Sequence, residues 1–143
     1  MILSQRQLVC LENILEKALI DKGVTCVFLI DMAGNIIVNL DDGKKQFDIY
    51  SLAALAAGNY GAVNAMAKIL GETDFSLLFH KGKNINIHFK SISTTFLLIT
   101  IFANDISLGF LRLKVAELAE KLKRILKPLR EVEINRSYSA LSA

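Results

Sequence analysis

Several features that would mark a membrane protein or a secreted protein are missing from this chain of 143 residues. The longest uncharged apolar run, FLLITIFA at residues 96–103, is far too short to cross a bilayer. The N-terminal segment is interrupted by Gln5, Arg6 and Glu12, so it does not have the pattern of a secretory signal. We therefore expect a cytoplasmic protein without membrane insertion. Its apolar content of 52% is high, and a subunit interface is the simplest place to bury the excess.

Motifs for metal binding and catalysis are also missing. Cys10 and Cys26 have no metal-binding spacing, and both lie in apolar patterns typical of reduced core residues. Residues 43–46 lack the first glycine and the hydroxyl of a phosphate-binding loop. His80 and His88 lie on the two arms of one predicted hairpin, on the same side but too far apart to share a metal. No serine lies in a GxSxG motif, so we expect no enzyme, no cofactor, no metal site and no catalytic residue.

The order of apolar and turn-forming segments predicts an α+β domain with an antiparallel sheet. Helices are expected over residues 4–22, 48–70 and 108–127, and strands over 25–31, 36–40, 75–79, 85–89 and 95–103. A three-residue loop at 81–83 would place six apolar residues on one face of the sheet: Phe75, Leu77, Phe79, Ile85, Ile87 and Phe89. Pro128 is expected to follow the end of the last helix. The folded domain would then be residues 1–127, with 128–143 as a polar, flexible tail.

The helix between the N-cap Asp48 and Gly71 is the most informative segment, because it has two different apolar stripes. One stripe has the pattern of ordinary core and contains Leu52, Leu55, Val63, Met66 and Leu70. The second has almost no side chain and contains Ala54, Ala57, Gly58, Gly61 and Ala65. Glycine inside a helix is unfavourable by about 1 kcal/mol relative to alanine, so this stripe indicates close approach of another backbone. It is either a tight internal seam or, with Asn59, Asn64 and Lys68 as a polar rim, a docking surface.

The net charge of +3 is too small to indicate a nucleic-acid partner, but basic residues gather in the last helix. Two interpretations remain open for this stretch. It is either a solvated face, with Glu117 and Glu120 paired to Lys121 and Arg124, or an electrostatic arm for an acidic partner. The residues of the possible arm are Lys121, Arg124, Lys127 and Arg130.

Four stretches of the sequence resemble the roadblock/dynein-light-chain domain family. FLIDMAGNII at 28–37 resembles the first hairpin of the family, and SLAALAAGNYGAVNAMAKILGE at 51–72 resembles its central helix. FHKGK at 79–83 resembles a strand end, and SLGFLRLKV at 107–115 resembles the entry to the last helix. The likeness covers roughly residues 5–125 and is greatest to the mutual gliding protein B group of bacterial polarity regulators. Tyr60 departs from the small residue that family members often have.

The resemblance implies a five-stranded antiparallel sheet with the central helix on one face and the terminal helices on the other. It also implies a homodimer that binds a Ras-like small GTPase over its paired central helices and activates GTP hydrolysis without an arginine finger. Ala57 and Gly61 would lie at that contact, in the stripe with Ala54, Gly58 and Ala65 beside Lys68. Two alternatives remain: a GTPase scaffold of the same fold that does not activate, and a small-molecule sensor of the PAS or GAF kind.

Overall fold

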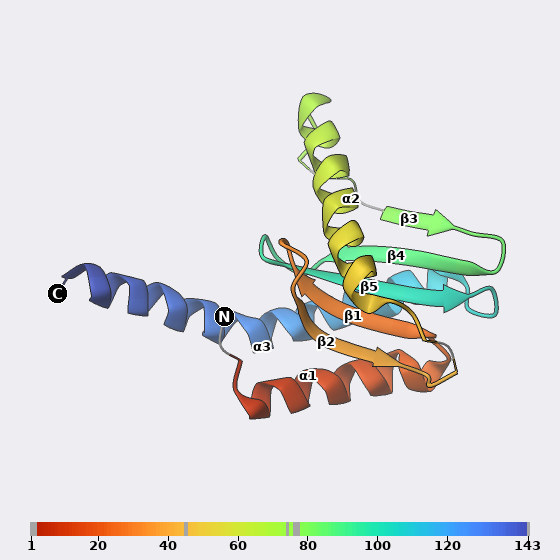
Figure 1. The fold of residues 1–143 in the computed structure, drawn as a ribbon, viewed down its shortest axis with the longest axis horizontal. Coiled ribbons are helices and arrows are strands. Elements are labelled where there is room, and N and C mark those ends of the chain that lie inside the picture. The colour runs from red at the N-terminus through yellow and green to blue at the C-terminus, as the bar shows by residue number, and fades with distance from the viewer. Residues whose placement is uncertain (1–2, 45, 74, 76–77, 143) are drawn as a thin grey trace.

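The fold is a five-stranded antiparallel sheet between one helix and a pair of helices (Figure 1). The computed structural model describes residues 3–44, 46–73, 75 and 78–142, with side chains as far as residue 126. In chain order the elements are α1 (Gln5–Ala18), the short 3-10 helix η1 (Ile20–Lys22), β1 (Cys26–Asp31), β2 (Ile36–Asp41), α2 (Ile49–Ile69), β3 (Leu78–Lys81), β4 (Ile85–Ser91), β5 (Phe96–Ala103) and α3 (Leu108–Ser142). The strands lie in the order β2-β1-β5-β4-β3, so the predicted element order and fold class are confirmed.

Local side-chain hydrogen bonds begin each of the three α-helices. The Ser4 hydroxyl accepts a hydrogen bond from the Gln7 N–H at 3.1 Å, and the Gln7 side chain accepts one from the Ser4 N–H at 2.9 Å. This reciprocal capping box satisfies two backbone donors that the first turn of α1 leaves free. Asp48 caps α2 through the Ser51 N–H, and Ser107 caps α3 through the Phe110 N–H.

Each face of the sheet carries its own hydrophobic core. On the α1 and α3 side, leucines from both helices pack against alternate residues of the strands, including Leu29, Leu98 and Phe102. On the α2 side, Phe28, Ile99 and their neighbours pack against the central helix. The strand β5 is buried along nearly its whole length because it lies between β1 and β4 with a core on either face. The predicted placement of the helices on opposite faces is therefore confirmed.

The hairpin of β3 and β4 has a different register from the predicted one. Leu78 pairs with Phe89 and Lys81 with Asn86, and the Gly82 N–H donates to the Ile85 carbonyl. The connection is thus one residue tighter than a three-residue loop, and the odd shift in pairing moves side chains of β3 to the opposite face.

Two consequences of this register correct the sequence prediction. Phe79 does not share a face with Phe89, because it joins the α1 and α3 core and stacks on Phe102 with ring centroids 6.0 Å apart. His80 and His88 lie on opposite faces of the sheet rather than on the same side. Phe75 precedes β3, and the predicted position of Leu77 lies outside the described residues.

The last helix is longer than predicted. α3 continues through Pro128 to Ser142, where the sequence had predicted an end near residue 127 and a loose tail. A proline removes one N–H donor from a helix, but the residues around it, rich in leucine, arginine and glutamate, favour helix and offset that loss. The C-terminal half of α3 projects away from the rest of the molecule (Figure 1). A domain boundary at residue 127 stays a prediction. Among the described residues, no helix combines the length and the apolar character that crossing a membrane requires.

Among the residues whose side chains are described, three polar side chains are buried on the α1 and α3 side of the sheet. They are Asn86 and His88 on β4 and Thr100 on β5, and His88 pairs directly with Thr100. Nδ1 of His88 and Oγ1 of Thr100 have no hydrogen-bond partner among the described residues. Burial, together with the smaller effect of the nearby charges of Arg112 and Lys90, lowers the pKa of His88 to about 4. The imidazole is therefore neutral at pH 7.

Candidate functional site

The side of α2 that meets the sheet is made of small residues. Its fully buried residues are Ala53, Ala56 and Ala67. The sheet supplies the large buried side chains of this core, among them Phe28 and Ile99, and the larger residues Ile49, Leu52 and Tyr60 of α2 pack against it only partly buried. The packing on this face is thus large residues from the strands against alanines from the helix.

The predicted core stripe of α2 is wrong at Leu55, Met66 and Leu70, while Leu52 does pack against this core. Leu55 is 71% exposed, Leu70 is 72% exposed, and Met66 is also exposed, while Leu52 and Val63 are half-buried. Periodicity had marked these positions as the inward face because they carry the largest apolar side chains. The alanines occupy the inward face instead. Large apolar side chains at 55, 66 and 69 therefore form an outer stripe of α2, together with Ala62.

The small-residue stripe predicted for docking lies on the surface. Ala54, Gly58, Gly61 and Ala65 are exposed, Ala57 is half-buried, and Lys68 at the end of the stripe is exposed. A Cβ atom added at Gly58 or Gly61 would have no neighbour within 4 Å. Internal packing therefore does not account for these two glycines among the described residues. The surface stripe leaves the backbone of α2 open to a partner.

At its N-terminal end the stripe does meet another backbone of the same chain. Gly34, in the turn between β1 and β2, has φ +92°, and a Cβ there would lie 3.2 Å from the Cα of Ala54. Asp31 holds this turn by accepting hydrogen bonds from the backbone of Ala33 and of Asn35. Burial raises the pKa of Asp31, but the hydrogen bonds from Asn35, Ala33 and Gly34 outweigh it and leave the pKa below its usual value. The internal-seam interpretation thus holds at Ala54, whereas the stripe is open at the glycines.

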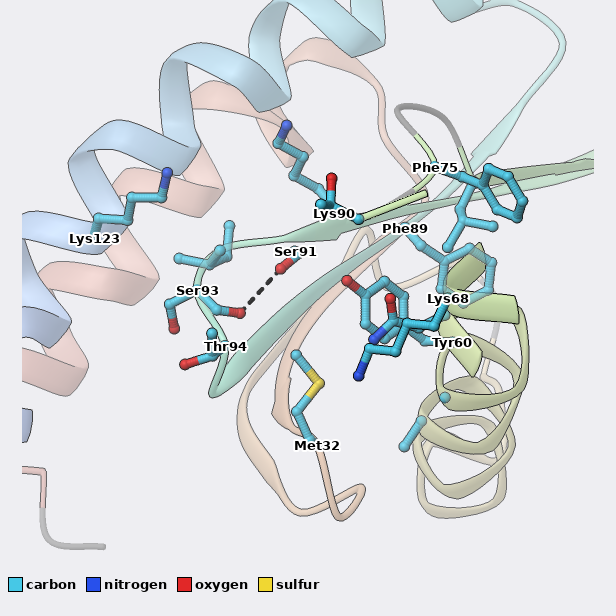
Figure 2. A pocket seen from close by; sticks show the side chains of 16 residues that line it. Met32, Tyr60, Lys68, Phe75, Phe89, Lys90, Ser91, Ser93, Thr94 and Lys123 are labelled. Carbon is cyan, nitrogen blue, oxygen red and sulfur yellow. Dashed lines mark hydrogen bonds between the residues drawn. The ribbon is translucent and has the colours of Figure 1, made fainter. Parts of the chain in front are cut away.

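A groove lies beside the small-residue stripe, where the helix faces the turn between β4 and β5 (Figure 2). Its volume is about 800 Å³. Ala57, Gly61 and Lys68 line it on the helix side, and the segment 90–94 lines it on the sheet side. Sequence reasoning did not find this groove, since it combines segments that are far apart in the chain. The polar run SISTT at 91–95, between two apolar strands, was the one available signal.

Contacts between α2 and β3 fix the helix along its polar rim. Nδ2 of Asn59 lies 3.1 Å from Nε2 of His80, within hydrogen-bond distance. The His80 ring in turn meets the Phe89 ring edge-on, with centroids 5.6 Å apart. Asn64, also half-buried, lines the groove. The rim residues therefore position the helix as well as facing solvent.

The described side chains of the predicted basic arm on α3 do not line the groove. Lys121 and Arg124 are exposed, and neither forms the predicted ion pair with Glu117 or Glu120 among the described side chains. Glu120 instead pairs with Lys123, one turn along the helix, at 3.3 Å. Lys127 and Arg130 lie within α3, but their side chains are outside the described set.

The cysteines and histidines form no reactive centre in the described part of the chain. No group of three or more His, Cys, Asp or Glu side chains there could hold a metal ion. Both cysteines are free, as predicted, but only Cys26 is a core residue and Cys10 is exposed. Burial, together with the smaller effect of the nearby charges of Asp41 and Asp42, raises the pKa of the Cys26 thiol to about 12. The Cys26 thiol is therefore fully protonated and unreactive at pH 7.

The sheet, the helix layers and the exposed central helix together form a roadblock-like fold. Among solved structures, the chain is similar to MglB of Myxococcus xanthus, with 29% identity over 83% of this chain and 96% of that one, at a TM-score of 0.77. It is also similar to the gliding protein MglB of Thermus thermophilus, with 28% identity over 90% and 96% and a TM-score of 0.82. A roadblock/LC7 domain from Streptomyces avermitilis shares the fold at 16% identity over 73% and 87%, with a TM-score of 0.65. No family model and no curated protein sequence matches the chain.

Proposed function

We propose that this chain is a homodimeric regulator of a Ras-like small GTPase, and that it activates GTP hydrolysis by docking through α2. The observation that carries the proposal is the open small-residue stripe of α2, on a roadblock domain similar to MglB structures. The proposed contact residues are Ala54, Ala57, Gly58, Gly61, Ala65 and Lys68. A helix surface of small side chains lets a partner backbone come close, so that both surfaces lose water over an interface of high shape complementarity.

The outer stripe of α2 supports self-association. Large apolar side chains on a protein surface mark interaction sites when they are contiguous, and Leu55, Met66 and Ile69 lie along one side of the helix. A similar chain, with 28% identity, has been solved as "MglB with tetrameric arrangement". We expect light scattering at micromolar concentration to give about twice the chain mass of 15.8 kDa. The double variant Met66→Glu/Ile69→Glu should give the monomer mass, and an unchanged mass would remove the outer stripe from the interface.

The proposed activator performs no chemistry of its own. α2 contains no arginine, so the docking helix has no side chain of the kind that enters a GTPase active site as a finger. Lys121, Arg124, Lys127 and Arg130 are proposed as an electrostatic arm that speeds encounter with an acidic partner surface. The catalytic groups would belong to the GTPase, and binding would act by stabilising its competent arrangement.

Single-turnover GTP hydrolysis tests the proposal. Each Ras-like GTPase of the same genome is loaded with GTP, and the rate is measured with and without saturating amounts of this protein. Acceleration supports an activator, whereas binding without acceleration supports the scaffold of the same fold. No binding to any of these GTPases would overturn the proposal. The sensor alternative has less support, because the sheet faces that would line a ligand cavity are filled by two packed cores.

A further inference from the structure

Two buried polar side chains lie next to each other on the α1 and α3 side of the sheet. His88 and Thr100 are directly paired residues of β4 and β5, and they are 4% and 0% exposed. The side chains of such a pair lie on one face, with Cβ atoms about 4.5–5.5 Å apart. Nδ1 of His88 and Oγ1 of Thr100 nevertheless have no hydrogen-bond partner, either in each other or elsewhere in the described part of the chain.

The surroundings of this pair offer no polar group of their own. Leu98 and Phe102, the residues of β5 on either side of Thr100 on the same face, belong to the hydrophobic core. β4 and β5 are both interior strands, so their backbone groups are used by the ladders with β3, with β1 and with each other. Removing an unpaired polar atom from water is unfavourable, and native proteins pair nearly all such atoms with protein groups or with internal water.

The chemistry of the two atoms selects the kind of ligand. A neutral imidazole nitrogen donates or accepts one hydrogen bond, and a hydroxyl does both. A cation is disfavoured here, because the charges that act on His88 are those of Arg112 and Lys90, both positive. An anion would favour a protonated ring, whereas burial and these two charges lower the pKa of His88 to about 4, so the ring is neutral at pH 7. A small uncharged ligand that both donates and accepts fits these conditions.

We infer that His88 and Thr100 bind one internal water molecule on the α1 and α3 side of the sheet. The water donates to one of the two atoms and accepts from the other, and it links β4 to β5 through their side chains. Internal waters typically form about three hydrogen bonds. Oδ1 of Asn86, buried on the same face of β4 and without a partner among the described residues, is available for the third. The inference is independent of the proposed GTPase function, because the site lies on the opposite face of the sheet from α2.

Two measurements on the full chain locate the water directly. A high-resolution crystal structure should show an isolated density peak within hydrogen-bond distance of Nδ1 of His88 and of Oγ1 of Thr100. In solution, the side-chain protons of Thr100 should show nuclear Overhauser effects to a long-lived water. A direct hydrogen bond between the two side chains, with no peak, would overturn the inference. An anomalous scattering peak at this place in crystals grown with bromide would identify an anion and would also overturn it.

The substitution Thr100→Val gives opposite results for a bound water and for an unpaired hydroxyl. If the water is bound, the variant removes one of its partners, and the midpoint of thermal unfolding should fall by roughly 3–5 °C. If the hydroxyl is unpaired, valine fits the core better, and the midpoint should rise. A midpoint that rises or stays unchanged would therefore overturn the inference.

Thr25→Val is the matched control, because it makes the same chemical change at a half-buried position just before β1. Its unfolding midpoint should stay within about 2 °C of that of the unmodified protein. If Thr100→Val does not fold, Thr100→Ser keeps the hydroxyl and should retain the density peak and the Overhauser effect. Loss of both signals in a folded Thr100→Ser variant would contradict the inference.

Discussion

The two faces of the sheet are covered by the same kind of element in opposite ways. On one face, α1 and α3 insert large leucines such as Leu15 and Leu111, which are fully buried. On the other face, the buried residues of α2 are alanines, and Leu55, Met66 and Ile69 turn outward. The first arrangement stabilises the fold, because burying a leucine side chain contributes about 2 kcal/mol. In the second arrangement the strands supply most of the large core side chains, and the outer surface of α2 stays available to a partner.

The largest expected effect is the difference in stability between two Leu→Ala substitutions, one on each helix layer. Leu111→Ala removes a fully buried side chain and should reduce the free energy of unfolding by roughly 2–5 kcal/mol. Leu55→Ala removes a side chain that is 71% exposed and should change monomer stability by less than about 0.5 kcal/mol. Denaturant unfolding of both variants, in a background that carries Met66→Glu/Ile69→Glu to prevent self-association, measures the difference. Equal losses would mean that the two faces are not distinct.

The next effect concerns the small-residue stripe. Gly61→Arg should weaken GTPase binding by about a hundredfold or more, because the side chain occupies the point of close approach and its charge would lose water on docking. The substitution meets open space in the free chain and replaces a helical glycine, so unfolding free energy should stay the same or rise by up to about 1 kcal/mol. Ala57→Arg should also abolish binding, although its half-buried position makes it the less clean probe.

Ala116→Arg, on the exposed side of α3, is the control for added bulk and charge on a helix. It should bind the GTPase like the unmodified protein. Normal binding by Gly61→Arg would show that the stripe is not the docking surface, and loss of folding would place it in the core after all.

A smaller effect is the pH dependence of the free energy of unfolding, which tests the buried polar residues on the α1 and α3 face. The pKa of His88 is about 4 in the folded chain, below the ordinary value of 6.5, so the unfolded chain binds the proton first as pH falls. The contribution of the neutral side chain is complete above pH 6.5 and is lost between pH 6.5 and 4. We expect roughly 2 kcal/mol less stability at pH 5 than at pH 7.5. His88→Leu should flatten this dependence, and an identical slope in the variant would contradict a buried neutral imidazole.

The smallest expected effects come from the arginines. None of the five, Arg6, Arg112, Arg124, Arg130 and Arg136, lies on α2. A true arginine finger contributes roughly three to five orders of magnitude to the rate, and no single Arg→Ala change here should approach that loss at saturating activator. Arg124→Ala and Arg130→Ala should weaken association by less than about tenfold, in a salt-dependent way. The test is the rate of single-turnover GTP hydrolysis with each variant. A thousandfold loss of this rate with unchanged affinity for the GTPase would overturn the mechanism.

Local signals in the sequence were sufficient for the element order and for most boundaries. Asp48 caps the helix that was assigned to it, and Ser4 and Ser107 cap α1 and α3 in the same way, because capping depends on a few neighbouring atoms. The end of α3 was wrong because one proline does not break a helix that its neighbours favour. The register of β3 was wrong because a hairpin with one loop residue fewer is equally compatible with the apolar pattern.

The orientation of α2 could not be predicted from periodicity. The helix has an apolar stripe of large residues and an apolar surface of small ones, and only the size of the opposing strand residues decides which one fits. Phe28 and Ile99 leave room for Ala53 and Ala56, not for Leu55. The groove could not be predicted either, because its two walls, on α2 and at 90–94, are far apart in the sequence and come together only in the folded chain.

The alanine and glycine content of α2 also bears on its motion. Of the described residues of the helix beyond Gly61, only Ala67 is fully buried, and the C-terminal end extends past the sheet (Figure 1). Few buried contacts and a glycine-weakened backbone place this half among the first segments to open locally, so its amide protons should exchange faster than those of residues 49–57. A partner that closes over it suppresses that opening. Recognition and helix ordering are then linked, and part of the interaction free energy is used to hold the last turns of α2 in place.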